Sequence, residues 1–522
     1  MVVYAYEPTG WEGELVKVEV DIRRGLPAFD LSGLPDAAVK ESRERIRAAV
    51  RNSGFEFPVD RVLVNLAPSD VPKGGASFDL PIALAILGAA GLVPDPGAPL
   101  LALGELGLSG AVAPVRGSLA AVAAAAAAGI MEAFVPPGNL VEAAALGEVR
   151  VRPLPNLAAA ALALIELRDG LPPPVPPAVH GQASASGASG AVPTGAVPPE
   201  PGDFSELRGQ GGLRRALELA AAGGHHVFLF GPPGSGKTMA ARRFPGILPE
   251  LDRRASLEAS RAHSLAGLAP PGGLVRRPPF RAPHHGASLE GMVGGGKRLV
   301  PGEVSLAHRG VLFLDEASEF RSDVLQALRE PVEDGRVSIA RAGRVASYPA
   351  RFQLVLAANP CPCGNLGRPG AACLCSEREI RAYWARVGGA LLDRIDLRVP
   401  LSAPEPSAFS DPPGESSAEI RRRVEAARER QASRYSGAPW SLNAELPPGA
   451  VERWCALDGS TRRRFEEEAR RLSLSARACH GALKVARSVA DLDGRDAIRA
   501  ADIDEAFFFR RFGDEDFYWK IP

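Results

Sequence analysis

A glycine-rich loop near the middle of the 522-residue chain carries the clearest chemical signature. It follows a short apolar run at residues 227–230, which is typical of a buried parallel strand, and a helical pattern begins after it. The spacing G-x-x-x-x-G-K-T defines a P-loop, whose backbone N–H groups point at phosphate oxygens while the helix dipole favours negative charge. The predicted phosphate-binding residues are Gly231, Pro232, Pro233, Gly234, Ser235, Gly236, Lys237 and Thr238.

Two residues of this loop and two later carboxylates predict hydrolysis of ATP with Mg²⁺ as the metal cofactor. We expect Lys237 to reach the β- and γ-phosphates and Thr238 to hold Mg²⁺. A second apolar strand, at residues 310–314, ends in Asp315 and Glu316. Because they accompany a P-loop, Asp315 is expected to support the Mg²⁺ ion and Glu316 to act as the base that polarises the attacking water.

Two further polar residues are candidates for the same reaction. A third apolar strand is expected over residues 348–359, and Asn359 at its end could orient water near the γ-phosphate. The alternative for Asn359 is a simple turn before the following proline. Arg394 lies between apolar positions, which suits an arginine finger offered to the γ-phosphate of a neighbouring subunit. The alternative for Arg394 is a local ion pair with Asp393 or Asp396.

Four of the six cysteines crowd into one loop directly after Asn359. The four clustered cysteines are Cys361, Cys363, Cys373 and Cys375. Two C-x-C pairs separated by nine residues supply four thiols, which suits a tetrahedral Zn²⁺ site, and reduced thiols in a glycine- and proline-rich loop are the alternative. Cys455 and Cys479 are isolated, and we expect them in the core.

The composition limits the classes of protein that can carry these motifs. Lys plus Arg number 61 and Asp plus Glu number 61, so the formal net charge is zero. A globally basic nucleic-acid coat is therefore excluded, while a local basic channel is not. The sequence has no apolar run of about 18 residues and no secretory signal pattern, so we expect a cytoplasmic protein without a membrane span.

The sequence predicts that the helices and strands around these motifs form three domains. Residues 1–170 read as mixed α/β, with strands at 15–22 and 61–66 and helices at 36–52 and 118–128. Residues 204–405 hold the P-loop α/β domain. Residues 406–522 read as a helical lid, and residues 171–203 are rich in Pro, Gly, Ala and Ser, which predicts a disordered linker. The helices expected in the last domain span residues 418–434, 447–457, 461–472, 476–492 and 501–510.

Several motifs identify a family that the chain resembles over essentially its whole length. The sequence reads FDLP at residues 78–81, RAPHH at 281–285, NPCPCG at 359–364 and LLDRIDL at 391–397. These segments are similar to the YifB/ComM family of magnesium-chelatase-like AAA+ ATPases. The resemblance implies a hexameric ring with ATP bound between subunits. It also implies DNA work, because ComM proteins are branch-migration helicases that help to integrate incoming DNA during natural transformation.

The resemblance also implies roles for three arginines. Residues 337–344 are similar to the pre-sensor-1 β-hairpin of the MCM helicase branch, in which a basic side chain faces the pore and touches the DNA backbone. Arg341 and Arg344 are therefore the candidate DNA contacts, and such phosphate contacts are independent of base sequence. Arg477 matches the sensor-2 position on a helix of the lid, where it would contact the γ-phosphate.

The first domain resembles the Lon-protease and ribosomal S5 domain-2-like fold. The alignment places Ser77 at the nucleophile position of Lon, but Leu119 stands where the Lon family has its lysine base. A serine needs a base to become a nucleophile, so we expect a scaffold without peptidase activity.

Three functions stay open at this point. They are a DNA-translocating AAA+ motor, a magnesium-chelatase-like or protein-remodelling ATPase without a DNA role, and, least favoured, a Lon-like protease. His284 and His285 are expected in the insert between the two nucleotide motifs, near DNA, and His225 and His226 in packing before the P-loop strand.

Overall fold

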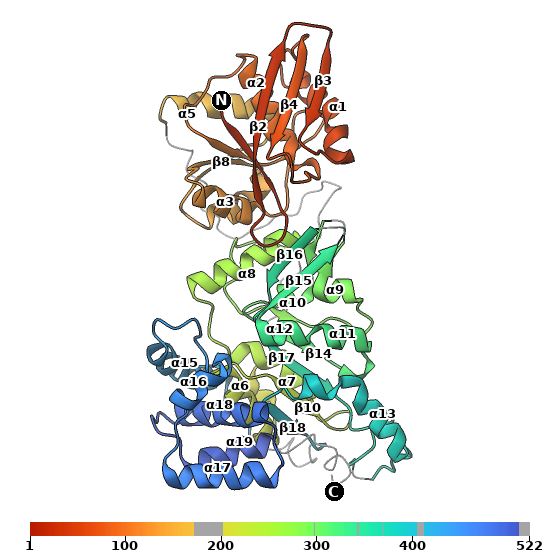
Figure 1. The fold of residues 1–522 in the computed structure, drawn as a ribbon, viewed down its shortest axis with the longest axis vertical. Coiled ribbons are helices and arrows are strands. Elements are labelled where there is room, and N and C mark those ends of the chain that lie inside the picture. The colour runs from red at the N-terminus through yellow and green to blue at the C-terminus, as the bar shows by residue number, and fades with distance from the viewer. Residues whose placement is uncertain (172–201, 297, 342–343, 369, 404–411, 511–522) are drawn as a thin grey trace.

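A seven-stranded sheet forms the N-terminal part of the computed structural model, drawn in red and orange in Figure 1. The structure describes residues 1–171, 202–296, 298–341, 344–368, 370–403 and 412–510. The predicted linker at 171–203 lies almost entirely outside the described residues, as does the turn of the hairpin predicted at 337–344. Among the described helices, none is long and apolar enough to cross a membrane.

The N-terminal sheet has the order β3-β4-β2-β1-β5-β8-β9. Its strands are β1 (Val3–Glu7), β2 (Glu14–Arg23), β3 (Ala28–Ser32), β4 (Arg61–Ala67), β5 (Leu100–Ala102), β8 (Glu132–Val135) and β9 (Arg150–Pro153), with a separate pair β6 (Glu105–Leu106) and β7 (Val112–Ala113). The helices are α1 (Ala37–Asn52), α2 (Asp79–Ala89), α3 (Ser118–Ala127), α4 (Leu140–Ala144) and α5 (Leu157–Arg168). The predicted strands at 15–22 and 61–66 and the predicted helices at 36–52 and 118–128 are confirmed. Asp36 begins α1 as predicted, because its carboxylate accepts the N–H of Val39 at 2.8 Å.

A five-stranded parallel sheet of order β11-β14-β17-β10-β18 forms the centre of the molecule. Its strands are β10 (Val227–Phe230), β11 (Phe280–Arg281), β14 (Val311–Leu314), β17 (Gln353–Ala358) and β18 (Leu397–Pro400). The surrounding helices are α6 (Gly211–Gly223), α7 (Lys237–Arg243), α8 (Arg253–Ala266), α9 (Leu289–Val293), α10 (Glu303–Leu306), α11 (Ser322–Ala327), α12 (Arg329–Asp334), α13 (Glu377–Val387) and α14 (Gly389–Leu392). A small pair, β12 (Gly294–Gly295) and β13 (Val300–Pro301), lies in the insert after β11.

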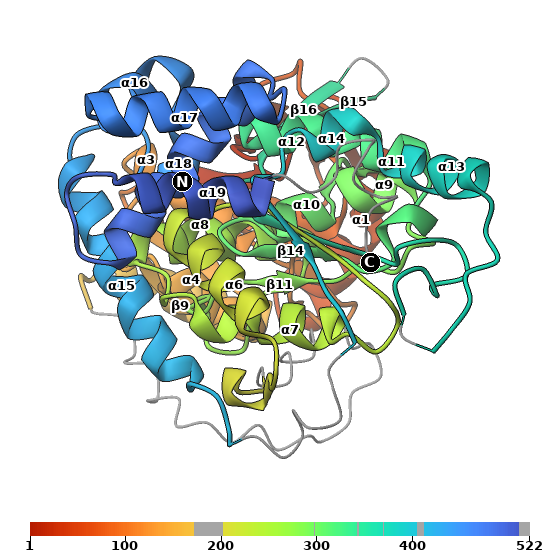
Figure 2. The same ribbon diagram turned by 90° about the horizontal axis from the view of Figure 1, so that it is seen from below.

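Both faces of this sheet are buried, which explains why its strands are continuous apolar runs. In β10, Val227 and Leu229 pack with α6, α7 and the C-terminal helices, while Phe228 and Phe230 pack with α11, α13 and α14 on the other face. The sheet is therefore covered on one side by α6 and α7 and on the other by α11, α13 and α14 (Figure 2).

The segment from residue 336 to residue 358 differs from its prediction in one respect. We expected one strand over 348–359, but Tyr348 and Pro349 end the hairpin strand β16 (Arg344–Pro349), and β17 begins only at Gln353. Proline has no N–H to continue a ladder, and the chain turns before it enters the central sheet. The hairpin partner is β15 (Arg336–Arg341), and Arg341 pairs with Arg344, so the predicted hairpin is confirmed.

Among the described residues of the C-terminal part there are five α-helices, drawn in blue in Figure 1. They are α15 (Ser417–Arg434), α16 (Pro448–Trp454), α17 (Gly459–Arg471), α18 (Ala476–Leu492) and α19 (Ala500–Arg510), and they confirm the five predicted helices. Their apolar residues join the core on the α6 and α7 side of the central sheet.

The N-terminal part packs directly on the central part through α3, α8 and the hairpin. The Trp11 N–H donates to the Ser347 carbonyl at 3.2 Å, and the Arg261 guanidinium lies 4.7 Å from the centre of the Trp11 ring. Gly117 N–H donates to the Ser264 carbonyl at 3.0 Å. One apolar cluster runs through both parts, so their contact is a packed interface.

Candidate functional site

The P-loop connects the carboxyl end of β10 to the amino end of α7. Gly234 and Gly236 have φ angles of +81° and +88°, which glycine adopts without strain and which turn the backbone around the loop. A Cβ on Gly231 would lie 2.3 Å from the Leu401 carbonyl oxygen, so this position also requires glycine. The local sequence therefore builds a cradle of backbone groups at one end of the sheet.

Lys237 spans this cradle and meets the predicted Asn359. Its Nζ donates to the carbonyls of Gly231 at 2.6 Å and Pro232 at 3.0 Å, and to Asn359 Oδ1 at 3.3 Å. Asn359 follows β17, which pairs with β10, so the two strand ends bring the residues together across 122 positions of sequence. Burial lowers the pKa of Lys237 to about 8, with Asp315 opposing the shift.

The predicted magnesium ligands also meet. Thr238 Oγ1 donates to Asp315 Oδ2 at 2.6 Å, and Asp315 follows β14, the other neighbour of β17. Glu316 has a φ of +51°, which is uncommon for a residue with a side chain, and its carboxylate is about half exposed. His285 Nδ1 lies 3.4 Å from Glu316 Oε2. The sequence places His285 in the insert, but nothing in its pattern indicates this contact with Glu316.

The loop fits a nucleoside triphosphate and Mg²⁺. The Ser235 hydroxyl is buried and has no hydrogen-bond partner among the described residues, so a buried donor is free for a phosphate oxygen. A Cβ built on Gly234 or Gly236 meets no atom within 4 Å, so the loop faces open space. The oxygens of Thr238 and Asp315 are of the kind that Mg²⁺ prefers.

Arg394 and Arg477 converge on one carboxylate, that of Glu333 in α12. Arg394 Nε donates to Glu333 Oε2 at 3.1 Å, and Arg477 Nη2 donates to Glu333 Oε1 at 2.6 Å. The hydrogen bond from Arg394 lowers the pKa of the Glu333 carboxyl. Arg394 thus pairs with Glu333 instead of Asp393 or Asp396, the two partners that the sequence offered. Glu333 was missed because it lies 61 and 144 positions from its partners.

The two arginines and the P-loop lie at opposite ends of the same sheet. The strands β10 and β18 are parallel, with Val227 opposite Leu397 and Phe230 opposite Pro400. The P-loop follows the carboxyl end of β10, whereas Arg394 precedes the amino end of β18. Four strand residues separate these ends by about 13 Å, at roughly 3.3 Å per residue. Arg394, and with it the Arg477 that shares Glu333, therefore lies at the end of the sheet opposite the phosphate cradle of its own chain.

The two candidate DNA contacts have different surroundings. Arg341 is exposed at the end of β15 and pairs with Glu290 at 3.1 Å, in a bridge whose two side chains are both about half exposed. Arg344 is half-buried, and its Nη2 donates to Thr9 Oγ1 at 3.0 Å in the N-terminal part. Arg341 is therefore accessible to solvent, whereas Arg344 takes part in the interface between the N-terminal and central parts.

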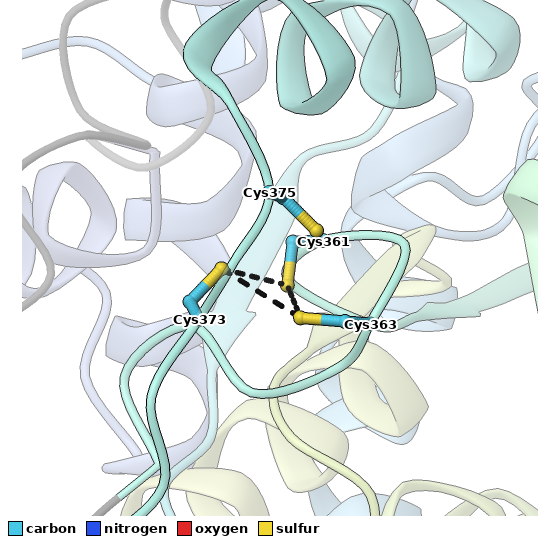
Figure 3. A group of neighbouring side chains, drawn as sticks. All are labelled: Cys361, Cys363, Cys373 and Cys375. Carbon is cyan, nitrogen blue, oxygen red and sulfur yellow. Dashed lines mark hydrogen bonds between the residues drawn. The ribbon is translucent and has the colours of Figure 1, made fainter.

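The four clustered cysteines lie together, as predicted from their spacing. Their sulfurs all lie within 4.8 Å of one another, and Figure 3 shows them turned toward a common centre. Cys361 is buried and Cys363 is exposed. Cys455 is buried, as predicted, whereas Cys479 is only partly so.

The remaining candidates occupy other places. Ser77 lies in a short turn before α2, and Leu119 is buried in the first turn of α3. His225 is buried before β10, where its Nδ1 lies 2.8 Å from Asp396 Oδ2 and its Nε2 lies 2.7 Å from Ser488 Oγ. Although this set has the residue types of a hydrolase triad, His225 and Ser488 are both fully buried, so the set joins α6, β18 and α18 as packing.

The parallel sheet with a P-loop after β10, carboxylates after β14 and an amide after β17 defines a P-loop nucleotide-binding protein of the AAA+ type. The family described as "Magnesium chelatase, subunit ChlI" matches residues 203–408, "Subunit ChlI of Mg-chelatase" matches 18–139, and "Magnesium chelatase, subunit ChlI C-terminal" matches 414–510.

Relatives match nearly the whole chain. An uncharacterized protein of Mycobacterium tuberculosis H37Rv is 42% identical over 97% of both chains. The uncharacterized protein YifB of Escherichia coli K12 is 39% identical over 98% of this chain and 96% of its own. The competence protein ComM of Haemophilus influenzae is 37% identical over 98% of this chain and 97% of its own. The chain therefore belongs to the YifB/ComM family of magnesium-chelatase-like AAA+ proteins.

Proposed function

We propose that the chain is an ATP-hydrolysing ring motor that acts on DNA in the cytoplasm, as a branch-migration helicase that supports integration of incoming DNA. The observation that carries the proposal is the placement of Arg394 and Arg477 at the sheet edge opposite the P-loop. Since these arginines lie at the other end of the sheet from their own cradle, they suit the nucleotide of a neighbouring subunit. Repetition of that head-to-tail contact closes a ring, and the family resemblance favours six subunits.

The residues around the P-loop have different roles in ATP hydrolysis. ATP supplies the γ-phosphoryl group, and Mg²⁺ neutralises phosphate charge, when both are bound. Lys237 and Ser235 hold phosphate oxygens, while Thr238 and Asp315 hold the ion. Glu316 accepts a proton from the attacking water, and Asn359 orients that water. The arginines of the adjacent subunit stabilise the charge that develops on transfer.

Two observations favour DNA as the substrate. Arg341 is about half exposed at the end of hairpin strand β15, so a ring presents one such guanidinium from each subunit. A circle of phosphate contacts grips a strand without reading its sequence. The second observation is the relative named for competence, which matches the chain over nearly its full length.

The alternative is a magnesium-chelatase-like or protein-remodelling ATPase without a DNA role, which the three family matches favour. Both functions need the P-loop, so ATP turnover alone does not separate them. Under the alternative, DNA neither binds to the ring nor changes its rate of hydrolysis.

The experiment that separates them measures strand movement. A synthetic three-way junction with one labelled strand is mixed with the full chain, ATP and Mg²⁺. We expect ATP-dependent release of the labelled strand by the wild type and none by Glu316→Gln, which retains ATP binding. Hydrolysis that is unaffected by any DNA, without strand release, would support the alternative.

A further inference from the structure

We propose that Cys361, Cys363, Cys373 and Cys375 bind one zinc ion, which braces the nucleotide site. Three of the sulfur–sulfur distances are 3.4, 3.6 and 3.7 Å. A tetrahedron of sulfurs at about 2.3 Å from zinc has edges of about 3.8 Å, so the observed spacing suits one ion at the centre. A disulfide bond needs about 2.0 Å, which none of these three pairs approaches.

Each of the four sulfurs also accepts a hydrogen bond from a backbone amide. The Leu366 N–H donates to Cys361 Sγ at 3.4 Å. The amides of Asn365, Cys375 and Cys363 donate to the sulfurs of Cys363, Cys373 and Cys375, respectively. Such N–H donors orient ligands around a metal ion and offset the negative charge that four thiolates bring together. The loop thus supplies both the ligands and their outer support.

The cysteine loop is joined to the nucleotide site at its start. Cys361 comes two residues after Asn359, the residue that contacts Lys237. The Pro360 carbonyl between them accepts the Trp384 Nε1–H at 3.1 Å, and the Trp384 ring packs edge-on against Phe228 of β10 at 5.4 Å between ring centres. The backbone that carries Asn359 is therefore fixed from both sides.

The loop also touches the P-loop. A Cβ on Gly364 would lie 2.9 Å from Pro233 Cγ, so the chain between the two cysteine pairs is packed against the phosphate cradle. The loop ends at Ser376, whose side chain begins α13 by accepting the Glu379 N–H. An ion that closes the loop thereby fixes Asn359, Pro233 and α13 relative to one another. Four protein ligands leave no open position, which is the pattern of a structural and not a catalytic zinc site.

The first test is the metal content of the full chain, purified under reducing conditions without chelator. We expect one zinc per chain by mass spectrometry, and a cobalt-substituted protein with the visible absorption of a tetrahedral thiolate site. The double variant Cys363→Ser, Cys375→Ser should lose the metal, and Cys479→Ser is the matched control that should keep it. Wild-type protein with less than about a tenth of an equivalent of zinc, with iron in its place, or with the cysteines in disulfides would overturn the proposal.

The second test measures how zinc affects nucleotide binding, and it requires neither ATP turnover nor DNA. We expect the double variant to bind a fluorescent ATP analogue at least tenfold more weakly than the wild type and Cys479→Ser. If the zinc-free variant bound the ATP analogue as tightly as the wild type, the proposed effect of zinc on the nucleotide site would be wrong, although the metal site itself would stand. A chain that holds zinc but moves no DNA would contradict the proposed function alone, so the two failures are distinguishable.

Discussion

Arg394 and Arg477 bind the two oxygens of a single carboxylate, that of Glu333. One arginine precedes β18 and the other begins α18, so the central part and the C-terminal helices present one joint cationic group. Glu333 and Arg477 are each 44% exposed, whereas Arg394 is only 13% exposed, so another molecule reaches this group first through Arg477 and Glu333. The carboxylate holds the two guanidinium groups together, and in the proposed ring a phosphate bound to the neighbouring subunit would compete with it for them.

The lowered pKa of Lys237 predicts how ATP affinity depends on pH. Well below pH 8 the lysine is charged before ATP arrives, and its contribution to binding is complete. Above about pH 8 the nucleotide-free protein has lost that proton and must take it up on binding, so the affinity falls by up to tenfold per pH unit. Titration with a fluorescent ATP analogue from pH 7 to pH 9.5 measures this. Lys237→Arg stays charged and serves as the flat control, and a flat wild-type profile would contradict the prediction.

Substitution of His285 is predicted to change the rate of ATP turnover without changing nucleotide binding. Its imidazole lies beside Glu316, so His285→Ala releases the carboxylate from its position. We expect kcat for ATP hydrolysis to fall by about tenfold or less, with the ATP dissociation constant unchanged, since a mispositioned base slows only the chemical step. His284→Ala is the neighbouring control. A variant with normal kcat and weakened ATP binding would place His285 in nucleotide recognition instead.

Arg341 predicts the salt dependence of DNA binding. Arg341→Ala removes an exposed guanidinium and is expected to weaken binding equally for all base sequences. The slope of log affinity against log salt should become shallower by about 0.9 for each DNA phosphate that the variant no longer neutralises, while hydrolysis without DNA is retained. Arg470→Ala, on the exposed face of α17, is the control of equal charge. A weakening confined to particular sequences would show that Arg341 reads bases.

Substitution of Ser488 is predicted to lower the stability of the folded chain. Its hydroxyl contacts His225 Nε2 and accepts the Asn443 Nδ2–H at 2.9 Å in the buried network that joins the C-terminal helices to the central sheet. Burial raises the pKa of Asp396 in this network, but the hydrogen bond from His225 and the positive charges of the surrounding groups together outweigh burial and lower the pKa to about 2. Ser488→Ala leaves buried partners unpaired and should destabilise the chain by about 1–3 kcal/mol.

Calorimetric unfolding measures this loss. Ser436→Ala, at an exposed position of the same part of the chain, is expected to change stability by no more than about 0.5 kcal/mol. If Ser488→Ala unfolded at the wild-type temperature, the network would not be the support inferred here.

The contacts of Lys237, Thr238, Asp315 and Asn359 could be anticipated from sequence for a physical reason. Each residue follows an apolar run, and the carboxyl ends of parallel strands meet at one edge of a sheet, so local patterns placed them together. The contacts of Glu333, His285 and Thr9 could not be anticipated in this way. Thr9 meets Arg344 across 335 positions, and only the packing of the N-terminal part on the hairpin creates that pair.

The strand boundary at residues 348–353 could not be predicted from the sequence either. Apolar residues run almost continuously there, and only the pairing of Tyr348 with Val337 assigns the first of them to the hairpin. Hydrophobic patterning indicates burial but not the sheet in which a residue is buried.

Complementation between two inactive variants tests the central claim that one ATP site is built from two subunits. Lys237→Ala lacks a working cradle and Arg394→Ala lacks the opposing guanidinium, so each alone is expected to lose at least 10³-fold in turnover. Mixed in equal amounts, they form interfaces in which an intact cradle faces an intact arginine, and hydrolysis should return to roughly a quarter of the wild-type rate, the share of random interfaces that pair the two intact halves. A mixture as inactive as its components would contradict the account.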